Sequence, residues 1–200
     1  MKALVIAEKP SVARDIARVL KCGKKINGAI EGERYIVTWG LGHLVTLADP
    51  EDYDKKYKEW KMDTLPMLPK HMKLVVLKKT GKQFNEVKRL MNRDDVVEIV
   101  IATDAGREGE LIFRYIYNYI GCNKPFVRLW ISSLTDKSIR EGLQNLKAGS
   151  LYDNLFLSAQ ARSEADYLIG INGTQALSVA AGQGIFSLGR VQSPTLAMIC

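Results

Sequence analysis

The chain has 200 residues, of which 46% are hydrophobic and 26% are charged, and its formal net charge is +7. These proportions exclude a disordered chain. The length suffices for one good core, or for one domain and the start of another. No apolar stretch approaches membrane-spanning length. The basic balance favours polyanionic partners, although charge alone identifies none.

The cysteines argue against two classes of protein. Cys22, Cys122 and Cys200 are odd in number and far apart, and no CxxC pair occurs. A zinc ribbon therefore has no ligands, and a disulfide framework is disfavoured. Reduced thiols fit a cytosolic setting, so we expect a cytoplasmic protein. The apolar run in the first eight residues is too short for a signal peptide and is typical of a strand.

Strand and helix patterns alternate through the first 150 residues. This alternation predicts an α/β fold with a mainly parallel sheet flanked by helices. The polar segment from Asp49 to Pro69, with scattered aromatics and prolines, is expected to be an ordered excursion. Ser11 and Thr135 are the expected caps of the helices that follow them. Strands are expected at 4–7, 32–39, 74–77, 96–102 and 127–131, and helices at 12–20, 84–91, 108–120 and 135–146.

The pattern changes after Gly149. Leu151 to Ala181 has no strand alternation and predicts one long helix or two. We therefore expect one domain at 1–150 and the beginning of a mostly helical domain at 151–200. The sequence ends within an apolar helical run that has no stop signal, and we expect that it is truncated there.

Acidic residues follow two of the expected strands. Glu8 comes directly after the first strand and Asp104 after the strand 96–102, with Glu108 and Glu110 close behind. Ligands of open parallel sheets bind outside the carboxyl ends of strands, so these acids are expected to converge. Clustered carboxylates repel one another unless a cation lies between them, and oxygen-only ligands favour Mg²⁺. Lys9 and Arg107 are placed to hold a phosphate.

The same residues have a simpler interpretation. Asp104 can cap the helix that follows it, and Asp-x-x-x-Glu is common by chance. His43, in a glycine-rich turn, is typical of a structural hydrogen bonder. With only His43 and His71 in the chain, a histidine metal site is not supported.

A second cluster lies near the end of the sequence. Residues 187–193 combine small side chains with Arg190 and Gln192 ahead of a helix that we expect to start at a proline. Main-chain NH groups, Arg190 and a helix N-terminus can all face a phosphate. An ordinary loop entering a helix would look the same. Arg162 and Asp166 are four residues apart, and by themselves they fit a solvated pair on one helix face.

These segments together resemble a known family. Glu8-Lys9-Pro10-Ser11, with 103–110 (TDAGREGE), resembles the Toprim domain of topoisomerases, primases and some nucleases. The segment 187–196 (SLGRVQSPTL) is similar to a long signature of type IA DNA topoisomerases. Residues 161–166 (ARSEAD), followed by Gly170, Asn172 and Thr174, resemble the helix that opens their DNA-binding groove, and 130–135 also fits. Residues 8–11 and the Trp60 segment are closer to bacterial topoisomerase III than to topoisomerase I.

The resemblance implies a Rossmann-like Toprim fold and an ATP-independent enzyme that cuts, passes and reseals single DNA strands. Cutting forms a 5′-phosphotyrosine link, and the outcome is relaxation or decatenation. Glu8 would protonate the departing 3′-oxygen and act as base on religation. Lys9 would stabilise phosphoryl charge. Glu8, Asp104 and Glu108 would hold Mg²⁺.

One position departs from the family pattern. The second aspartate of the Toprim motif falls at Gly106, which offers no side-chain ligand, so we expect weaker Mg²⁺ binding with Glu108 as substitute or outer-shell ligand. The resemblance places single-stranded DNA against Trp60, Arg162, Asp166, Tyr167, Gln175, Ser187, Leu188, Gly189, Arg190, Val191 and Gln192.

None of the eight tyrosines follows the family's nucleophile pattern, so the chain by itself is expected to be inactive. Two other readings remain. A Toprim nuclease or primase-like enzyme has no reason to carry the 187–196 signature. A non-catalytic single-strand-binding module would bind DNA without Mg²⁺ and tolerate loss of Glu8. The sequence indicates no membrane contact and identifies no protein partner.

Overall fold

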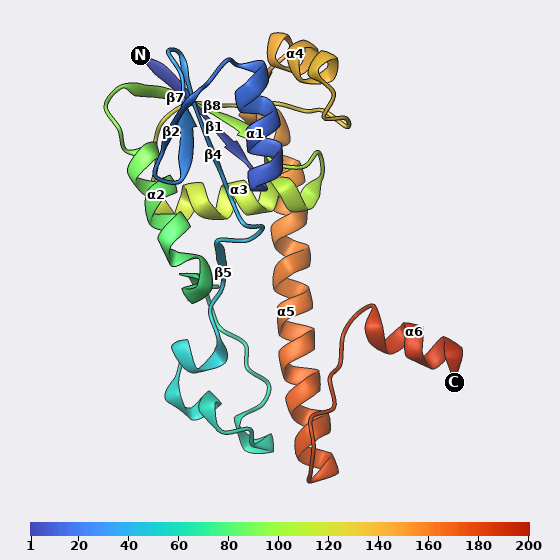
Figure 1. Ribbon diagram of the computed structural model, residues 1–200. Helices are drawn as coiled ribbons and strands as arrows, with labels where there is room; N and C mark the ends of the chain where they lie inside the picture. The colour runs from blue at the N-terminus through green and yellow to red at the C-terminus, as the bar shows by residue number, and fades with distance from the viewer. The chain divides into compact units, whose positions relative to one another are not determined.

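The computed structural model describes all residues 1–200, which form two compact units (Figure 1). The sheet unit comprises residues 1–46 and 75–159, and the helical unit comprises residues 47–74 and 160–200. Each unit is thus built from two separate stretches of chain. None of the helices combines the length and apolar character needed to cross a membrane.

The sheet unit is organised around a seven-stranded sheet with the order β2-β3-β4-β1-β7-β8-β9. Its four central strands, β4, β1, β7 and β8, are parallel, and the outer strands are antiparallel. The predicted α/β fold with a mainly parallel sheet is therefore confirmed. The strands are β1 (Lys2–Ala7), β2 (Lys24–Ile26), β3 (Ala29–Glu31), β4 (Tyr35–Trp39), β7 (Val96–Ala102), β8 (Phe126–Arg128) and β9 (Lys147–Ala148).

Both faces of β1 and β7 are buried toward their carboxyl ends, which explains the apolar runs at 4–7 and 99–102. Val5 and Ala7 pack in one core cluster with residues of α1 and α4. Leu4 and Ile6 point to the opposite face and are also buried. The helices of this unit are α1 (Pro10–Val19), α2 (Gly81–Met91), α3 (Arg107–Ile120) and α4 (Asp136–Gln144).

One of the three helix N-caps that the sequence suggested is confirmed, and two are wrong. Thr135 caps α4, accepting a hydrogen bond from the Ser138 amide. Ser11 is not a cap, because α1 already begins at Pro10, whose fixed φ and missing N–H suit a first helical position. The N-cap of α3 is Gly106, so Asp104 does not cap that helix.

The excursion 47–74 belongs to the helical unit. The chain enters the excursion through β5 (Val45–Leu47) and comes back from it through β6 (Leu74–Val76), and these two strands pair with each other. The expected strand near 74–77 therefore lies outside the central sheet. It contains three 3₁₀ turns (Pro50–Asp52, Lys55–Lys58 and Met62–Thr64).

Hydrogen bonds attach the excursion to α5 (Asp153–Ala181), a single helix of 29 residues. The Tyr167 hydroxyl donates to the main-chain oxygen of Ala48 at 2.7 Å. The Asn172 amide both accepts from the Met67 N–H, at 2.6 Å, and donates to the Met67 oxygen, at 3.0 Å. The excursion is therefore ordered by side chains of a distant helix. A final helix, α6, spans Gln192–Ile199.

Candidate functional site

Two of the predicted acids lie at neighbouring strand ends. Glu8 follows β1 directly, and Asp104 lies two residues beyond β7, in a parallel pair where Ala7 is opposite Ala102. The Asp104 amide donates a hydrogen bond of 3.2 Å to Glu8 Oε2. The carboxyl ends of β1 and β7 thus bring these two residues together at the edge where α/β proteins bind ligands.

Lys9 lies between the two carboxylates. Its Nζ is 3.6 Å from Glu8 Oε1 and 3.6 Å from Asp104 Oδ2. These oxygens are therefore at most twice that distance apart, so the two carboxylates lie in the same small region of the sheet edge. The ammonium also reduces the repulsion between the two acids. The Asp104 side chain is 60% exposed, so the cluster is open on that side.

Glu108 lies in a different contact. Its Oε1 is 2.6 Å from His43 Nε2, and its side chain is 71% exposed. No group of three or more His, Cys, Asp or Glu side chains is arranged to hold a metal ion. His43 is a neighbour that the sequence interpretation treated only as a structural hydrogen bonder. Its turn is attached to the cluster, because the Gly42 amide donates to the Glu8 main-chain oxygen at 3.3 Å.

The chemistry of this edge suits a divalent cation held by few ligands. Glu8 and Asp104 supply the hard oxygen atoms that Mg²⁺ and Ca²⁺ prefer. A Cβ at Gly106 would meet no atom within 4 Å, so a side chain could be accommodated at that position. At Gly109, in contrast, a Cβ would collide with the Asp104 main-chain oxygen. The first turn of α3 can therefore pack against the Asp104 segment only with glycine there.

Glu110 lies away from this edge, in a buried ionic network. It has no exposed surface, and its carboxylate pairs with Arg114 at 2.9 Å and Arg128 at 3.2 Å. Burial raises the pKa of the Glu110 carboxyl and lowers the pKa of the Arg128 guanidinium, and the opposite charges counteract both effects. The sequence grouped Glu110 with the converging acids, and this grouping is wrong because its side chain faces the protein interior. Sequence reasoning assigned no role to Arg128.

A second cluster is formed within the helical unit by α5 and the loop before α6. Arg190 binds the Asp166 carboxylate through Nε and, at 3.3 Å, through Nη2. Arg162 Nε lies 3.7 Å from the same carboxylate. The Arg190 guanidinium holds the pKa of Asp166 below its usual value. Asp166 is therefore shared by two arginines. The prediction of a simple solvated pair with Arg162 on one helix face missed the contact with Arg190.

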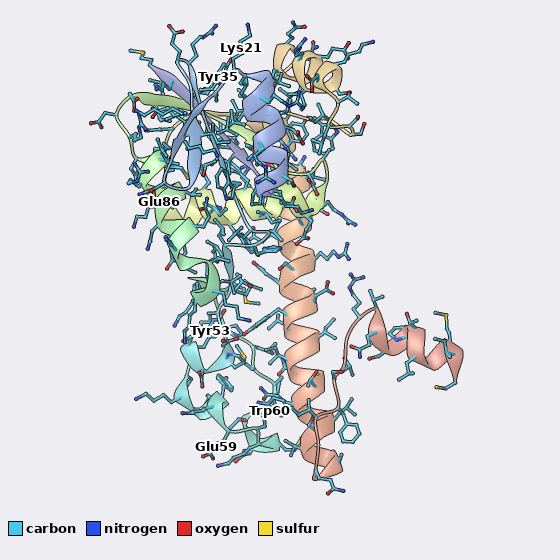
Figure 2. The ribbon with its side chains drawn as sticks, in the orientation of Figure 1. Lys21, Tyr35, Tyr53, Glu59, Trp60 and Glu86 are labelled. Atoms are coloured by element: carbon cyan, nitrogen blue, oxygen red, sulfur yellow. The ribbon has the colours of Figure 1, made fainter.

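Beside this cluster is a pocket of about 330 Å³. Trp60, labelled in Figure 2, reaches it from the excursion, and the other lining residues belong to α5 and to the 187–191 loop. Five of the residues predicted to face DNA line it: Trp60, Asp166, Tyr167, Gln175 and Leu188. Its remaining lining residues are Gly170, Ile171 and Thr174.

The other predicted residues belong to the loop and its junctions. The Leu188 amide donates to Thr174 Oγ1 at 2.9 Å, and Gln192 Nε2 donates to Ser187 Oγ at 3.3 Å. The Gly189 amide donates to Ser193 Oγ at 3.1 Å, and Val191 is 61% exposed. The helix begins at Gln192, two residues before Pro194, so it does not start at the proline as expected.

Residues 3–134 match the family model described as the Toprim domain. The chain belongs to the Toprim family. Toprim domains are metal-dependent, and Glu8 and Asp104 provide carboxylate oxygens at the ends of β1 and β7 of this one. Residues 150–200 match a second family model, described as DNA topoisomerase.

Relatives of this Toprim chain carry the name DNA topoisomerase 3. It is 64% identical to the protein of Bacillus anthracis and 61% identical to that of Bacillus subtilis, each over 99% of this chain. The chain spans 27% of the length of these relatives. Among solved structures, the full-length topoisomerase I of Thermotoga maritima is similar in fold. The match covers 98% of this chain and 29% of the Thermotoga chain, with a TM-score of 0.66 and 22% sequence identity. The predicted resemblance to the topoisomerase III branch of type IA enzymes is confirmed.

Proposed function

We propose that the whole protein is a type IA DNA topoisomerase, which cuts one DNA strand, passes another through the break and reseals it. The observation that carries this proposal is the Glu8–Lys9–Asp104 cluster at adjacent strand ends, in a chain 61–64% identical to proteins named DNA topoisomerase 3. Two carboxylates and an ammonium suit the handling of a phosphodiester, because they can exchange a proton and balance its charge.

We assign the acid–base role to Glu8. Its side chain is largely buried, and the Asp104 amide fixes one carboxylate oxygen. A carboxyl held in this way can protonate the 3′-oxygen that departs during cutting and take the proton back during resealing. Lys9 is more exposed and contacts both acids, so it can turn from them to a phosphate oxygen and stabilise the charge of the reacting phosphoryl group.

Mg²⁺ is the cation we propose for the oxygen atoms of Glu8 and Asp104, where it would neutralise phosphate charge when bound. Glu108 would serve as an outer ligand, since its carboxylate contacts His43 and not the other two acids. With two carboxylates and no side chain at Gly106, binding should be weak.

The second cluster suits a single strand of DNA. Unpaired bases can stack on an aromatic ring and pair through their edges with polar side chains, and the pocket offers Trp60 and Gln175 for these contacts. Arg162 and Arg190 are exposed enough to meet backbone phosphates while they hold Asp166. Paired bases in a duplex would not be free to enter the pocket.

Binding of fluorescent oligonucleotides to the chain tests this assignment. Single strands should bind better than duplex, with an affinity that falls steeply as salt rises. Trp60→Ala should weaken binding by roughly 5- to 100-fold through lost stacking. Arg162→Ala and Arg190→Ala should also weaken binding, whereas Lys147→Ala, which removes an exposed lysine of β9, should not. Equal losses in all four variants would mean diffuse charge attraction and would refute the assigned groove.

A further inference from the structure

The sheet unit contains a pocket that the proposed function does not use. Its volume is about 490 Å³. It lies between the end of β4 and the start of α2, and Glu86, labelled in Figure 2, marks its α2 side. The residues that matter for its chemistry are Trp39, Leu41, Lys79, Lys82, Gln83 and Glu86.

This pocket opens at the same edge of the sheet as the acid cluster. Trp39 is the last residue of β4 and pairs in parallel register with Ala7, the last residue of β1, which Glu8 follows. Adjacent strands lie about 4.8 Å apart, so the pocket begins one strand away from Glu8. The Gly40 amide donates to the Ala7 oxygen at 2.8 Å, which fixes the turn between Trp39 and His43 against the Glu8 segment.

The cations of the pocket are free to bind a ligand. Lys79 and Lys82 are exposed, and neither forms an ion pair or a side-chain hydrogen bond. Glu86 is the only acid of the lining, and Arg89 already neutralises it with contacts of 2.7 and 2.8 Å. The pocket therefore presents two uncompensated positive charges.

Its remaining groups offer a flat apolar surface and directed polar atoms. Gln83 Nε2 donates to the Trp39 main-chain oxygen at 2.8 Å and so joins the wall formed by α2 to the end of β4. The Gln83 amide oxygen is left without a donor. An indole, a leucine, a free amide oxygen and two lysines are the groups that bind a base, its edge and a phosphate of a single strand.

We infer that this pocket binds a nucleotide of the same DNA strand that the acid cluster holds. The base lies against Trp39 and Leu41, and the phosphate lies between Lys79 and Lys82. A strand leaving Glu8 along the sheet edge crosses the end of β4 next. The inference rests on the proposed function, because it takes the DNA strand at Glu8 as given.

Two measurements test the inference. The double variant Lys79→Ala/Lys82→Ala should weaken single-strand binding by at least about fivefold and lower the salt slope by about 0.7, the value for one neutralised phosphate on a single strand. The matched control, Lys137→Ala/Lys147→Ala, removes two exposed lysines from α4 and β9 and should change neither quantity. Oligonucleotides that carry 5-iodouracil should crosslink on irradiation to the peptide containing Trp39, and less so in the first double variant.

The outcomes separate this inference from the function on which it rests. If Arg190→Ala weakens binding while Lys79→Ala/Lys82→Ala binds like the unmodified chain, the pocket is not a nucleotide site and the groove assignment stands. If neither weakens binding, both proposals are refuted. Crosslinks that form only at Trp60 or Trp130 would also overturn the inference.

Discussion

The guanidinium of Arg128, which has no exposed surface, donates a hydrogen bond of 2.7 Å to the main-chain oxygen of Asp104. A second nitrogen donates to the Thr103 oxygen at 2.8 Å. Glu110 neutralises Arg128 and also pairs with Arg114, whose other nitrogen binds Asp153 in the first turn of α5 at 2.6 Å. One buried network thus holds the segment that carries a proposed metal ligand and the start of the long helix.

Arg128→Met should therefore destabilise the protein by about 3–5 kcal/mol, because it leaves Glu110 buried with one cation fewer. Urea denaturation followed by fluorescence measures the loss. Arg140→Ala removes an exposed arginine of α4 and should change stability by less than about 0.5 kcal/mol. The double change Arg128→Met/Glu110→Leu should recover part of the loss. A loss below about 1 kcal/mol in the single variant would show that Arg114 alone satisfies Glu110.

The converging acids were predictable because their positions follow from simple patterns. Apolar runs identify β1 and β7, and the acids follow within two residues of the strand ends. The sequence could not show which way later side chains point. Glu108 and Glu110 lie in the same helical turn, yet one is 71% exposed and the other is fully buried. Packing against the sheet decides between them, and spacing along the chain does not.

Very short strands and contacts between residues far apart in the sequence could not be predicted either. Strands β2, β3 and β9 have two or three residues each, too few to show alternation. The excursion 47–74 has no periodic pattern, because its order comes from Tyr167 and Asn172 more than one hundred residues away. Trp60 was predicted from the family resemblance, whereas the pocket beside Trp39 had no motif to reveal it.

Gly106→Asp should strengthen Mg²⁺ binding by at least about tenfold, since it adds a third carboxylate to the two-acid site. The position is free for a side chain, because its φ of 170° is extended backbone and a Cβ there meets nothing within 4 Å. Isothermal titration of the chain with MgCl₂ gives the affinity. Gly23→Asp also places an aspartate in open space, and its affinity should match that of the unmodified chain. Asp104→Asn should reduce binding, and equal affinity in that variant would move the metal elsewhere.

The stability of the helical unit should decrease in alkali through Tyr167. Burial raises the pKa of this phenol above its usual value of 10.0, and the hydroxyl donates to Ala48 in its neutral form. Because the pKa of Tyr167 is higher in the folded than in the unfolded protein, its contribution to stability is complete below pH 10. That contribution is lost as pH rises through the folded-state pKa. Tyr167→Phe cannot ionise there. Denaturation between pH 8 and 11 should show the stability gap between the two proteins shrinking with pH, and a constant gap would contradict the prediction.

The 200-residue chain should neither relax nor nick negatively supercoiled plasmid in Mg²⁺, because none of its tyrosines follows the nucleophile pattern. Plasmid relaxation and a denaturing gel for protein–DNA adducts provide the readouts. A covalent adduct would place the nucleophile among the eight tyrosines of this chain. Nicking without an adduct, lost in Glu8→Ala, would instead favour a Toprim nuclease. In the full-length protein, Glu8→Ala should lower relaxation by about 10²- to 10⁴-fold.

The bonds from Asn172 to Met67 also constrain how the protein is made. The ribosome adds Asn172 105 residues after Met67, an interval of about 5–20 s at usual rates of synthesis. Met67 is 1% exposed in the complete protein. During that interval the part of α5 that contains Asn172 has not yet been synthesised. A nascent chain stalled near residue 160 should therefore be cleaved by protease within 47–74, whereas the complete chain should resist cleavage there. Until α5 is finished, this stretch lacks the two side chains that order it.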